Sequence, residues 1–395
     1  MSIDYVAPKI LFTAPQNIQN IISSLGRTED VKFSPSGQRL AVASFAANKI
    51  AIFDVFIASS QNSKNITFTA AFEISSNFLK CPHGVDFIDD EKIVVANRDG
   101  KACVFELPVG KTGTHELAPV AVIPSDDIST PGSVAVVRKE GDFYEVLICN
   151  NFMHRVTRHL FDLGKGYRAN KNEILLEKWM DIPDSVCVSK DKRWIAVSNH
   201  TTHAILLYKN DSALNPRSSP DGILRNHYPH GLRFTSDDRF VVAASAGSPY
   251  VNVYQTESSD WQGVRAPILS VRVLNTEEFL RGRHGREEGG PKGVDIHDAM
   301  GVLVTTCEMQ PLGFFDFDAV RDYVDDNFLQ RQSVFRKKFA FCPNSLAVRG
   351  ELYRERIIVS IIAAMRWILW KVRPLSWMLN RVRALLNVGP VPKPY

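Results

Sequence analysis

The chain has 395 residues, of which 45% are hydrophobic and 23% are charged, and its formal net charge is +4 at pH 7. This composition is typical of a globular protein with enough apolar residues for a core, and so small a charge does not by itself indicate nucleic-acid binding. The excess of basic residues lies in residues 350–395, so the body of the chain is close to neutral. We therefore expect no nucleic acid among the partners.

The six cysteines lie far apart and form no Cys-x-x-Cys motif. Most of them stand in apolar, strand-like runs, where a free cysteine behaves as a small hydrophobic residue. We expect them to be reduced and structural, which fits a reducing compartment such as the cytoplasm. The N-terminal sequence "MSIDYVAPKILFTAPQ" has no basic region followed by a long apolar core, so we expect no signal peptide.

A six-residue anchor of the form Pro-x-Gly/Ser-apolar-x-apolar recurs along the chain at spacings of 46 to 62 residues. This spacing is in the range of propeller-type repeats. The anchors begin at Thr28 (a variant without proline), Pro82, Pro131, Pro183, Pro229, Pro291 and Pro343.

Each anchor is followed by the pattern of three further strands. In the first copy a polar turn "SPSGQ" (34–38) precedes the β-rich runs "LAVASF", "KIAIFDV" (49–55) and "TFTAAFEI" (67–74). These runs are too short and too β-branched to favour helices. Four antiparallel strands repeated radially are typical of a β-propeller, so we predict an all-β, seven-bladed β-propeller over residues 1–374.

The seventh copy, from residue 343 to 372, has a pattern for only three strands. The segment "PKILFTAP" (8–15) is a strand without a blade of its own. We predict that it supplies the outer strand of the seventh blade and closes the ring, which removes an open sheet edge. Outside the repeat, we predict a long loop over 276–290 and a short helix over 318–335.

The unit P-x-G-V-x-F-x-x-D-x-x-x-V-V-A-N-x-x-x-x-x-V-x-V-F resembles the repeats of the YVTN/lactonase-like β-propellers. The clearest matches are "SPSGQRLAVASFAANKIAIFDV", "CPHGVDFIDDEKIVVANRDGKACVFEL" and "PHGLRFTSDDRFVVAASAGSPYVNVYQ". The resemblance covers nearly the whole chain and implies a propeller fold. It leaves the function open, because the group includes sugar-lactone hydrolases, cofactor-bearing enzymes and binding modules.

The topology of a propeller also predicts where a site would lie. The turn before the first strand and the end of the second strand share one face of the ring. We therefore expect two sets of residues to surround the channel mouth on that face. They are Glu29, His83, Gly132, Asp184, His230, Lys292 and Asn344 before the first strands, and Asn97, Arg98, Asn150, Asn199, His200 and Glu308 after the second strands.

Two functions fit such a mouth, which is concave and is lined from many blades. The first is a non-enzymatic binding or scaffold propeller that recognises a small polar ligand or a protein partner, since no catalytic constellation with a demonstrable spacing is present. In this function the ligand-binding residues would be Glu29, Asn97, Asn150, Asp184, Asn199, His200 and Asn344.

The alternative is a lactonase-like hydrolase acting on a sugar-derived or similar small lactone. His83 or His230 would be the general base, and the oxyanion would be stabilised by Arg98 or Lys292, with Glu308 assisting. For any single one of these residues, lining a wet channel is the commoner role.

Neither a metal nor a cofactor is expected. His83, His200 and His230 lie on different blades, and no spacing rule places them at a shared metal site. The sequence also lacks G-x-S-x-G, Walker and G-x-G-x-x-G motifs.

The C-terminal tail is apolar and basic. Residues 357–370 contain Arg366 and are shorter than the about 20 residues that a membrane-spanning helix needs. After Pro374, apolar residues recur at helical spacing between basic ones, which predicts an amphipathic helix within 375–395. This helix either packs on the propeller or docks on an anionic membrane surface or an acidic partner. We expect a cytoplasmic monomer, with peripheral membrane attachment as the alternative.

Overall fold

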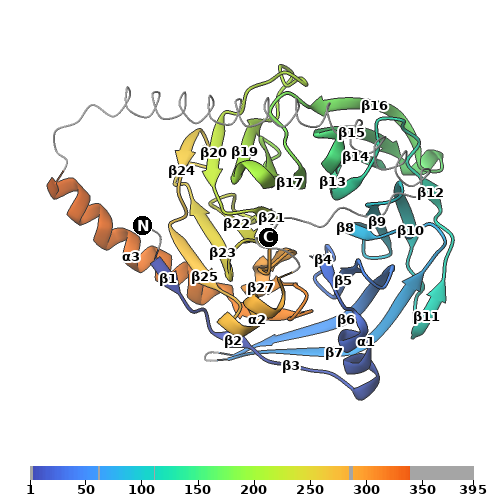
Figure 1. Ribbon diagram of the computed structural model, residues 1–395, viewed down its shortest axis with the longest axis horizontal. Helices are drawn as coiled ribbons and strands as arrows, with labels where there is room; N and C mark the ends of the chain where they lie inside the picture. The colour runs from blue at the N-terminus through green and yellow to red at the C-terminus, as the bar shows by residue number, and fades with distance from the viewer. Residues whose placement is uncertain (1–2, 61–62, 111, 284–287, 339–395) are drawn as a thin grey trace, which may run out of the picture.

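The computed structural model describes residues 3–60, 63–110, 112–283 and 288–338. Within these ranges six β-sheets stand around a central axis, as Figure 1 shows in a view along that axis. The chain is therefore mostly β, as predicted, but its propeller has six blades and not seven.

Each blade is a sheet whose strands follow one another outward, from an inner strand at the axis to an outer strand at the rim. Blade one contains β4 (Thr28–Phe33), β5 (Arg39–Ser44), β6 (Lys49–Ser59) and β7 (Lys64–Ser75). Blade two contains β8 (Pro82–Asp89), β9 (Lys92–Asn97), β10 (Ala102–Glu106) and β12 (Ala121–Val122), while β11 (Gly113–Glu116) pairs in parallel with β7. Blade three contains β13 (Pro131–Glu140), β14 (Phe143–Asn150), β15 (Arg155–Asp162) and β16 (Arg168–Leu176).

The other three blades follow the same order. Blade four contains β17 (Pro183–Val188), β18 (Trp194–Asn199), β19 (Ala204–Lys209) and β20 (Gly222–Arg225), to which β24 (Gly263–Arg265) adds in parallel. Blade five contains β21 (Pro229–Phe234), β22 (Phe240–Ser245), β23 (Tyr250–Gln255) and β25 (Leu269–Arg272). Blade six contains β26 (Val294–His297), β27 (Val302–Thr305), β28 (Gly313–Asp316) and β2 (Lys9–Ile10).

The core lies between consecutive blades, because each sheet buries both of its faces against its neighbours. Strands such as β9 ("KIVVAN") are therefore apolar without a break rather than alternating. Between blades one and six, for example, Phe53 and Phe68 pack in one cluster with Val304 and Phe314. In the six copies that the structure describes, burial on both faces thus explains why each anchor is followed by three further strand-like apolar runs.

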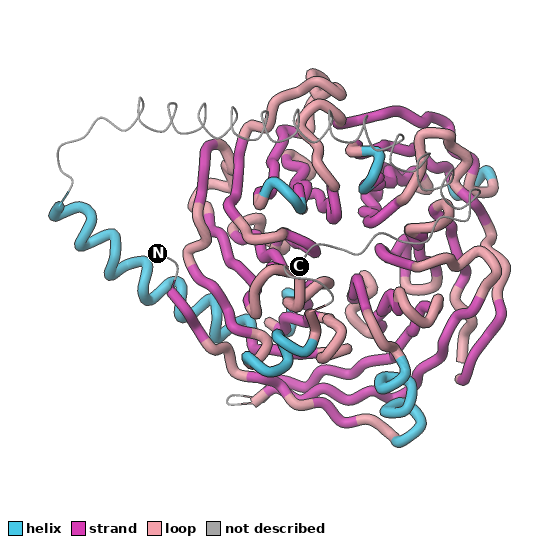
Figure 2. The backbone as a smooth tube through the Cα atoms, viewed as in Figure 1, coloured by secondary structure: helices cyan, strands magenta, loops and turns pink. Residues whose placement is uncertain are grey.

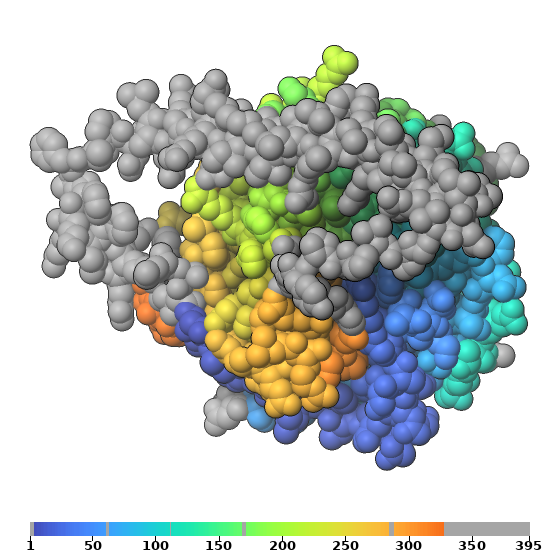
Figure 3. Space-filling model, viewed as in Figure 1, coloured from blue at the N-terminus to red at the C-terminus, as the bar shows by residue number. Residues whose placement is uncertain are grey.

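The first and sixth blades meet directly, so the ring formed by the described residues closes with six blades. β26 contacts β4, and the Gly293 position is so close to blade one that an added Cβ would lie 2.8 Å from Asp30 Cα. Figure 3 shows blue atoms of the N-terminal part beside orange atoms from much later in the chain. The seventh copy at 343–372 and the predicted helix within 375–395 lie outside the described residues.

The N-terminal segment closes the ring, although on different blades from the predicted one. β1 (Ile3–Tyr5) pairs with β25 of blade five, β2 pairs with β28 of blade six, and β3 (Phe12–Thr13) pairs with β7 of blade one. We call residues 3–13 the N-terminal strap, because they bind three consecutive blades along the rim. The prediction of one strand over 8–15 was therefore too simple.

Helices are few and lie at the loops or the rim (Figure 2). α1 (Gln16–Ser24) follows the strap, and α3 (Phe317–Lys338) covers the predicted helix at 318–335. The loop predicted over 276–290 was wrong at its beginning, where α2 (Thr276–Arg281) forms instead. Asn275 and Glu278 form a capping box at the start of this helix. Short 3₁₀ turns occupy Asn151–Met153, Leu163–Lys165, His200–Thr202 and Asp298–Met300. In the described ranges, no helix is long and apolar enough to cross a membrane.

Candidate functional site

A β-bulge near the start of the inner strand takes the residue after the first anchor position out of the ladder in blades one to five. In four blades the pairing register skips the residue after the first anchor position: Glu29, His83, Gly132 and Asp184 have no opposite partner. In blade five the skip includes His230. A bulged residue is left out of the ladder and its side chain is re-aimed, so these positions can converge although they lie on different blades.

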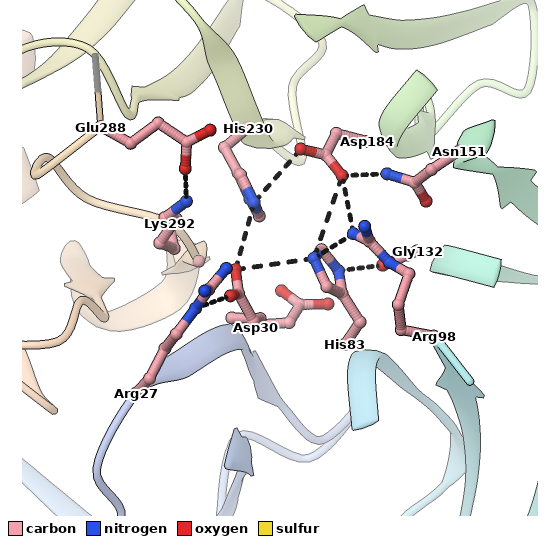
Figure 4. Close-up of polar contacts among 12 residues, drawn as sticks. Arg27, Asp30, His83, Arg98, Gly132, Asn151, Asp184, His230, Glu288 and Lys292 are labelled. Atoms are coloured by element: carbon pink, nitrogen blue, oxygen red, sulfur yellow. Dashed lines mark hydrogen bonds and ion pairs between the residues drawn. The ribbon is translucent and has the colours of Figure 1, made fainter. Parts of the chain in front are cut away.

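We call Glu29, His83, Asp184, His230 and Lys292 the mouth cluster; they come from blades one, two, four, five and six (Figure 4). Their relative exposures are 1%, 3%, 6%, 3% and 6%, so charged and polar groups are buried together near the axis. Such burial is costly unless the groups are paired or bind something.

Two imidazoles and two carboxylates form the centre of the mouth cluster. Glu29 Oε2 lies 3.2 Å from His230 Nε2 and 3.6 Å from His83 Nε2. The Asp184 carboxylate approaches the same two nitrogens, at 3.3 Å from His230 Nε2 and 4.0 Å from His83 Nε2. The two rings are stacked with their centroids 5.3 Å apart. Both Nε2 atoms therefore point to the space between the carboxylates.

Cations flank this centre. Arg27 pairs with Glu29 Oε1, and Lys292 pairs with Glu288. Arg98 Nη2 lies 2.5 Å from His83 Nε2 and 3.4 Å from Asp184 Oδ1. Figure 4 shows these contacts around the axis.

Backbone and amide groups hold two members of the mouth cluster in place. His83 Nδ1 lies 2.6 Å from the carbonyl oxygen of Gly132, an acceptor only, so Nδ1 carries the proton and Nε2 presents its lone pair. Asn151 donates to Asp184 Oδ1. Gly132 contributes no side chain because Asn151 fills that space: an added Cβ would lie 1.7 Å from Asn151 Oδ1.

Burial and the neighbouring charges set the protonation of the mouth cluster. Burial, with the adjacent Arg98, lowers the pKa of His83 to about 3, so this imidazole is neutral at physiological pH. Burial opposes ionisation of Glu29, but Lys292 and the two imidazoles outweigh it and hold the pKa of Glu29 well below its usual value. Burial likewise opposes ionisation of Asp184, and the histidines and Arg98 outweigh it and lower its pKa.

His200 extends the mouth cluster toward blade six. Its Nδ1 lies 3.3 Å from Asp184 Oδ2, and its Nε2 lies 3.0 Å from Glu288 Oε1. Burial lowers the pKa of His200, but Glu288 and Asp184 outweigh burial and raise it overall. The sequence analysis missed Glu288, because it belongs to a charged segment that was predicted as a loop without a role.

The other predicted site residues are engaged differently. The side-chain oxygens of Asn97, Asn150 and Asn199 accept from the backbone N–H groups of Lys80, Ser129 and Asp181, which precede the inner strand of the same blade. These amides therefore brace their own blades. Burial opposes the charge of Arg27, but Glu29, Glu288 and Glu308 outweigh it and raise the pKa of Arg27. Glu308 follows Cys307, whose carbonyl oxygen accepts from Thr28 Oγ1 at the start of β4. Asn344 lies outside the described residues.

A cavity of about 430 Å³ opens at the opposite end of the channel. It is lined by turns of blades one and six and by the fifth residue of each blade's six-residue anchor, among them Lys32, Asp86, Arg233 and Asp295. The sequence analysis missed these charges although they stand in apolar strands. Period-two alternation from the third anchor residue could have indicated that they face the channel.

Carboxylates of this lower channel join consecutive blades. Asp295 Oδ2 accepts from Phe33 N at 2.7 Å, Asp30 Oδ2 from Val85 N at 3.1 Å, and Asp86 Oδ2 from Val136 N at 2.8 Å. Burial raises the pKa of Asp30 to about 7, and it also raises the pKa values of Asp86 and Asp295. These groups link inner strands that are not paired with each other in one sheet.

The six radial sheets and the polar cluster on their axis define a β-propeller with a candidate ligand site at one mouth of its channel. No protein-family model matches the sequence, and no curated protein matches it. Among solved structures, the chain is similar to hydrazine synthase of Kuenenia stuttgartiensis, with a TM-score of 0.44 and 13% identity. The match covers 73% of this chain and 83% of that chain.

Proposed function

We propose that this chain is a binding propeller that takes a small polar ligand at the mouth cluster. The observation that carries the proposal is a set of buried polar atoms with unused hydrogen-bonding capacity. Arg98 Nε and Asn151 Oδ1 have no hydrogen-bond partner within the described part of the chain, and Glu29 Oε2 has only the two imidazole nitrogens at 3.2 Å and 3.6 Å. An unsatisfied buried polar group costs about 1–3 kcal/mol, so a ligand that meets such groups is stabilised against water.

The burial of the mouth cluster favours a small ligand. No member is more than 6% exposed, so a large molecule could enter only if the surrounding side chains moved. The charges are balanced, since Arg27, Arg98 and Lys292 face Glu29, Asp184 and Glu288. A ligand with both acceptor and donor capacity, or one that binds the carboxylates and imidazoles together, fits this pattern best.

The second candidate function is lactone hydrolysis. It is favoured by two stacked imidazoles, His83 and His230, with the Arg98 guanidinium beside His83. An imidazole base beside a guanidinium is a combination that ester and lactone hydrolysis uses. The resemblance to the lactonase-like propellers supports this candidate, whereas the burial of the mouth cluster opposes it.

A thermal-unfolding screen tests the proposal. The probes are aldonolactones, the corresponding aldonates, free sugars, small dicarboxylates and divalent metal chlorides. A ligand present at 100 times its Kd adds about 2.7 kcal/mol to the free energy of unfolding, so the midpoint should rise clearly. The rise should be lost in His230→Ala and kept in His115→Ala, which removes an imidazole from the edge strand β11.

The outcomes are decisive for both candidates. If no probe raises the midpoint of the wild type more than that of His230→Ala, the mouth cluster is not a ligand site. The aldonolactones are also assayed for hydrolysis. Turnover by the wild type that disappears in His230→Ala would make the chain a hydrolase and refute a purely binding role.

A further inference from the structure

We infer that the mouth cluster binds one divalent transition-metal ion through Glu29 Oε2, His83 Nε2 and His230 Nε2, with Asp184 as the fourth ligand. The inference rests on the proposed function, because it names the ligand of the same site. It reverses the expectation from sequence that the histidines of different blades do not share a metal site.

The distances suit a tetrahedral ion. The three ligand atoms of Glu29, His83 and His230 all lie within 4.8 Å of one another. All three residues are buried, and each comes from a different blade. Bonds of about 2.0–2.2 Å to nitrogen and oxygen place the ligands of a tetrahedral site about 3.3–3.6 Å apart. Glu29 Oε2 is 3.2 Å and 3.6 Å from the two nitrogens, so small side-chain shifts complete the geometry.

The ligand atoms are also presented as a metal site requires. Donation from His83 Nδ1 to the Gly132 carbonyl directs the Nε2 lone pair at the centre, and such a backbone acceptor is the usual partner of a metal-binding imidazole. The bond from Asn151 orients Asp184 in the same way. Glu29 uses Oε1 to bind Arg27, so Oε2 is buried and faces only the two imidazole nitrogens.

The donor set selects the class of ion. Two imidazole nitrogens with carboxylate oxygens suit Zn²⁺, Co²⁺ or Ni²⁺, whereas Ca²⁺ and Mg²⁺ prefer oxygen ligands only. We therefore expect zinc and cobalt to bind and calcium to bind much more weakly.

Arg98 is the group that competes with the ion. Its Nη2 takes the His83 lone pair, and its positive charge disfavours a cation at the centre. The Arg98 guanidinium also lies over the ring of Phe152, 5.3 Å from the ring centroid, and Phe152 is 47% exposed. The guanidinium can therefore move outward along that ring when an ion enters. Removal of Arg98 should strengthen metal binding, which a purely structural network of ion pairs does not predict.

The test is equilibrium dialysis of the full chain after treatment with a chelator. Wild type should bind one equivalent of zinc, and Co²⁺ should give visible d–d bands without a thiolate charge-transfer band. Loss of a group that only orients a metal ligand weakens metal binding by about 10- to 100-fold. We expect a larger loss of zinc affinity when a ligand atom itself is removed, as in His83→Gln, His230→Gln and Glu29→Gln. His115→Ala should bind as the wild type does, and Arg98→Ala should bind more tightly.

Each result either supports or overturns the inference. Circular dichroism confirms that every variant is folded before its affinity is compared. The inference is wrong if wild type binds neither zinc nor cobalt, or if the folded His83→Gln/His230→Gln double variant binds zinc as the wild type does. If the metals fail but an organic probe still stabilises the wild type in the unfolding screen, the metal inference fails and the proposed function stands.

Discussion

One buried carboxylate, Asp295, contributes to the closure of the ring between blades six and one. Its Oδ1 accepts from Arg233 Nε at 2.9 Å, and its Oδ2 accepts from the Phe33 backbone N–H at 2.7 Å. The side chains of Arg233 and Asp295 are only 14% and 10% exposed. The substitution Asp295→Ala leaves the buried Arg233 guanidinium without this partner and removes the hydrogen bond from Phe33 N of blade one.

The expected cost follows from that burial. Breaking a buried ion pair by removing one partner costs about 3–5 kcal/mol, and the lost bond to Phe33 N is included in that loss. An exposed pair is the matched control: Arg239 and Asp325 are 3.2 Å apart with side chains 43% and 48% exposed. Asp325→Ala should cost about 0–1 kcal/mol.

The assay is urea unfolding of both variants and the wild type at neutral pH. The midpoint should fall for Asp295→Ala with little change in the slope, because the surface exposed on unfolding is nearly the same. Replacing Arg233 by Met in the Asp295→Ala background should recover part of the loss, since no buried charge is then left unpaired. Equal costs for Asp295→Ala and Asp325→Ala would refute the magnitude and the buried pairing of Asp295 with Arg233 from which it follows.

Three further predictions concern the mouth and the tail. Gly132→Ala should destabilise the fold by about 1–3 kcal/mol in urea unfolding, because its Cβ would clash with Asn151; an unchanged midpoint would contradict the packing at this position. Since Glu288 and Asp184 raise the pKa of His200 above 6.5, its contribution to stability is complete below that value and is lost as the pH rises through the raised pKa. His200→Gln should therefore lower the thermal midpoint more at about pH 5.5 than at about pH 8.5, and the opposite order would be inconsistent with this charge state. Truncation after Pro374 should reduce co-sedimentation with anionic liposomes, and salt should weaken the binding of the full chain; the membrane proposal fails if the full chain does not bind.

The sequence predicted the inner strand and the outward order of strands in each blade, because both depend on local patterns. The anchor that begins at Pro82 is an inner strand, and "KIVVAN" is the second strand of the same blade. The predicted number of blades, seven, was wrong, since the anchor is short and its apolar alternation is common to many strands. Whether β26 reaches β4 is decided by packing across the whole ring, and this packing is not visible in any one repeat.

The same limit applies to the site. The anchor register predicted that Glu29, His83, Asp184, His230 and Lys292 surround one mouth, and the structure brings the first four into contact, with Lys292 close enough to lower the pKa of Glu29. The sequence could not show that the two Nε2 atoms and Glu29 Oε2 converge within a few ångströms. That convergence depends on the bulges, on Gly132 and Asn151, and on the angles between blades. The bracing role of the strand-end asparagines was equally invisible, because an asparagine at such a position fits a ligand as well as a backbone N–H group.

The N-terminal strap has a consequence for the order of folding. Residues 3–5 pair with blade five and residues 9–10 with blade six, yet they are synthesised before either blade exists. Residues 3–5 and 9–10 therefore obtain these partners only after residues 269–271 and 314–315 have been synthesised, and the ring is completed by a contact of very high sequence separation. Until that moment β25 and β28 have free edges, which can pair with another chain. Loss of the strap should thus slow the last folding step and favour association between incomplete rings.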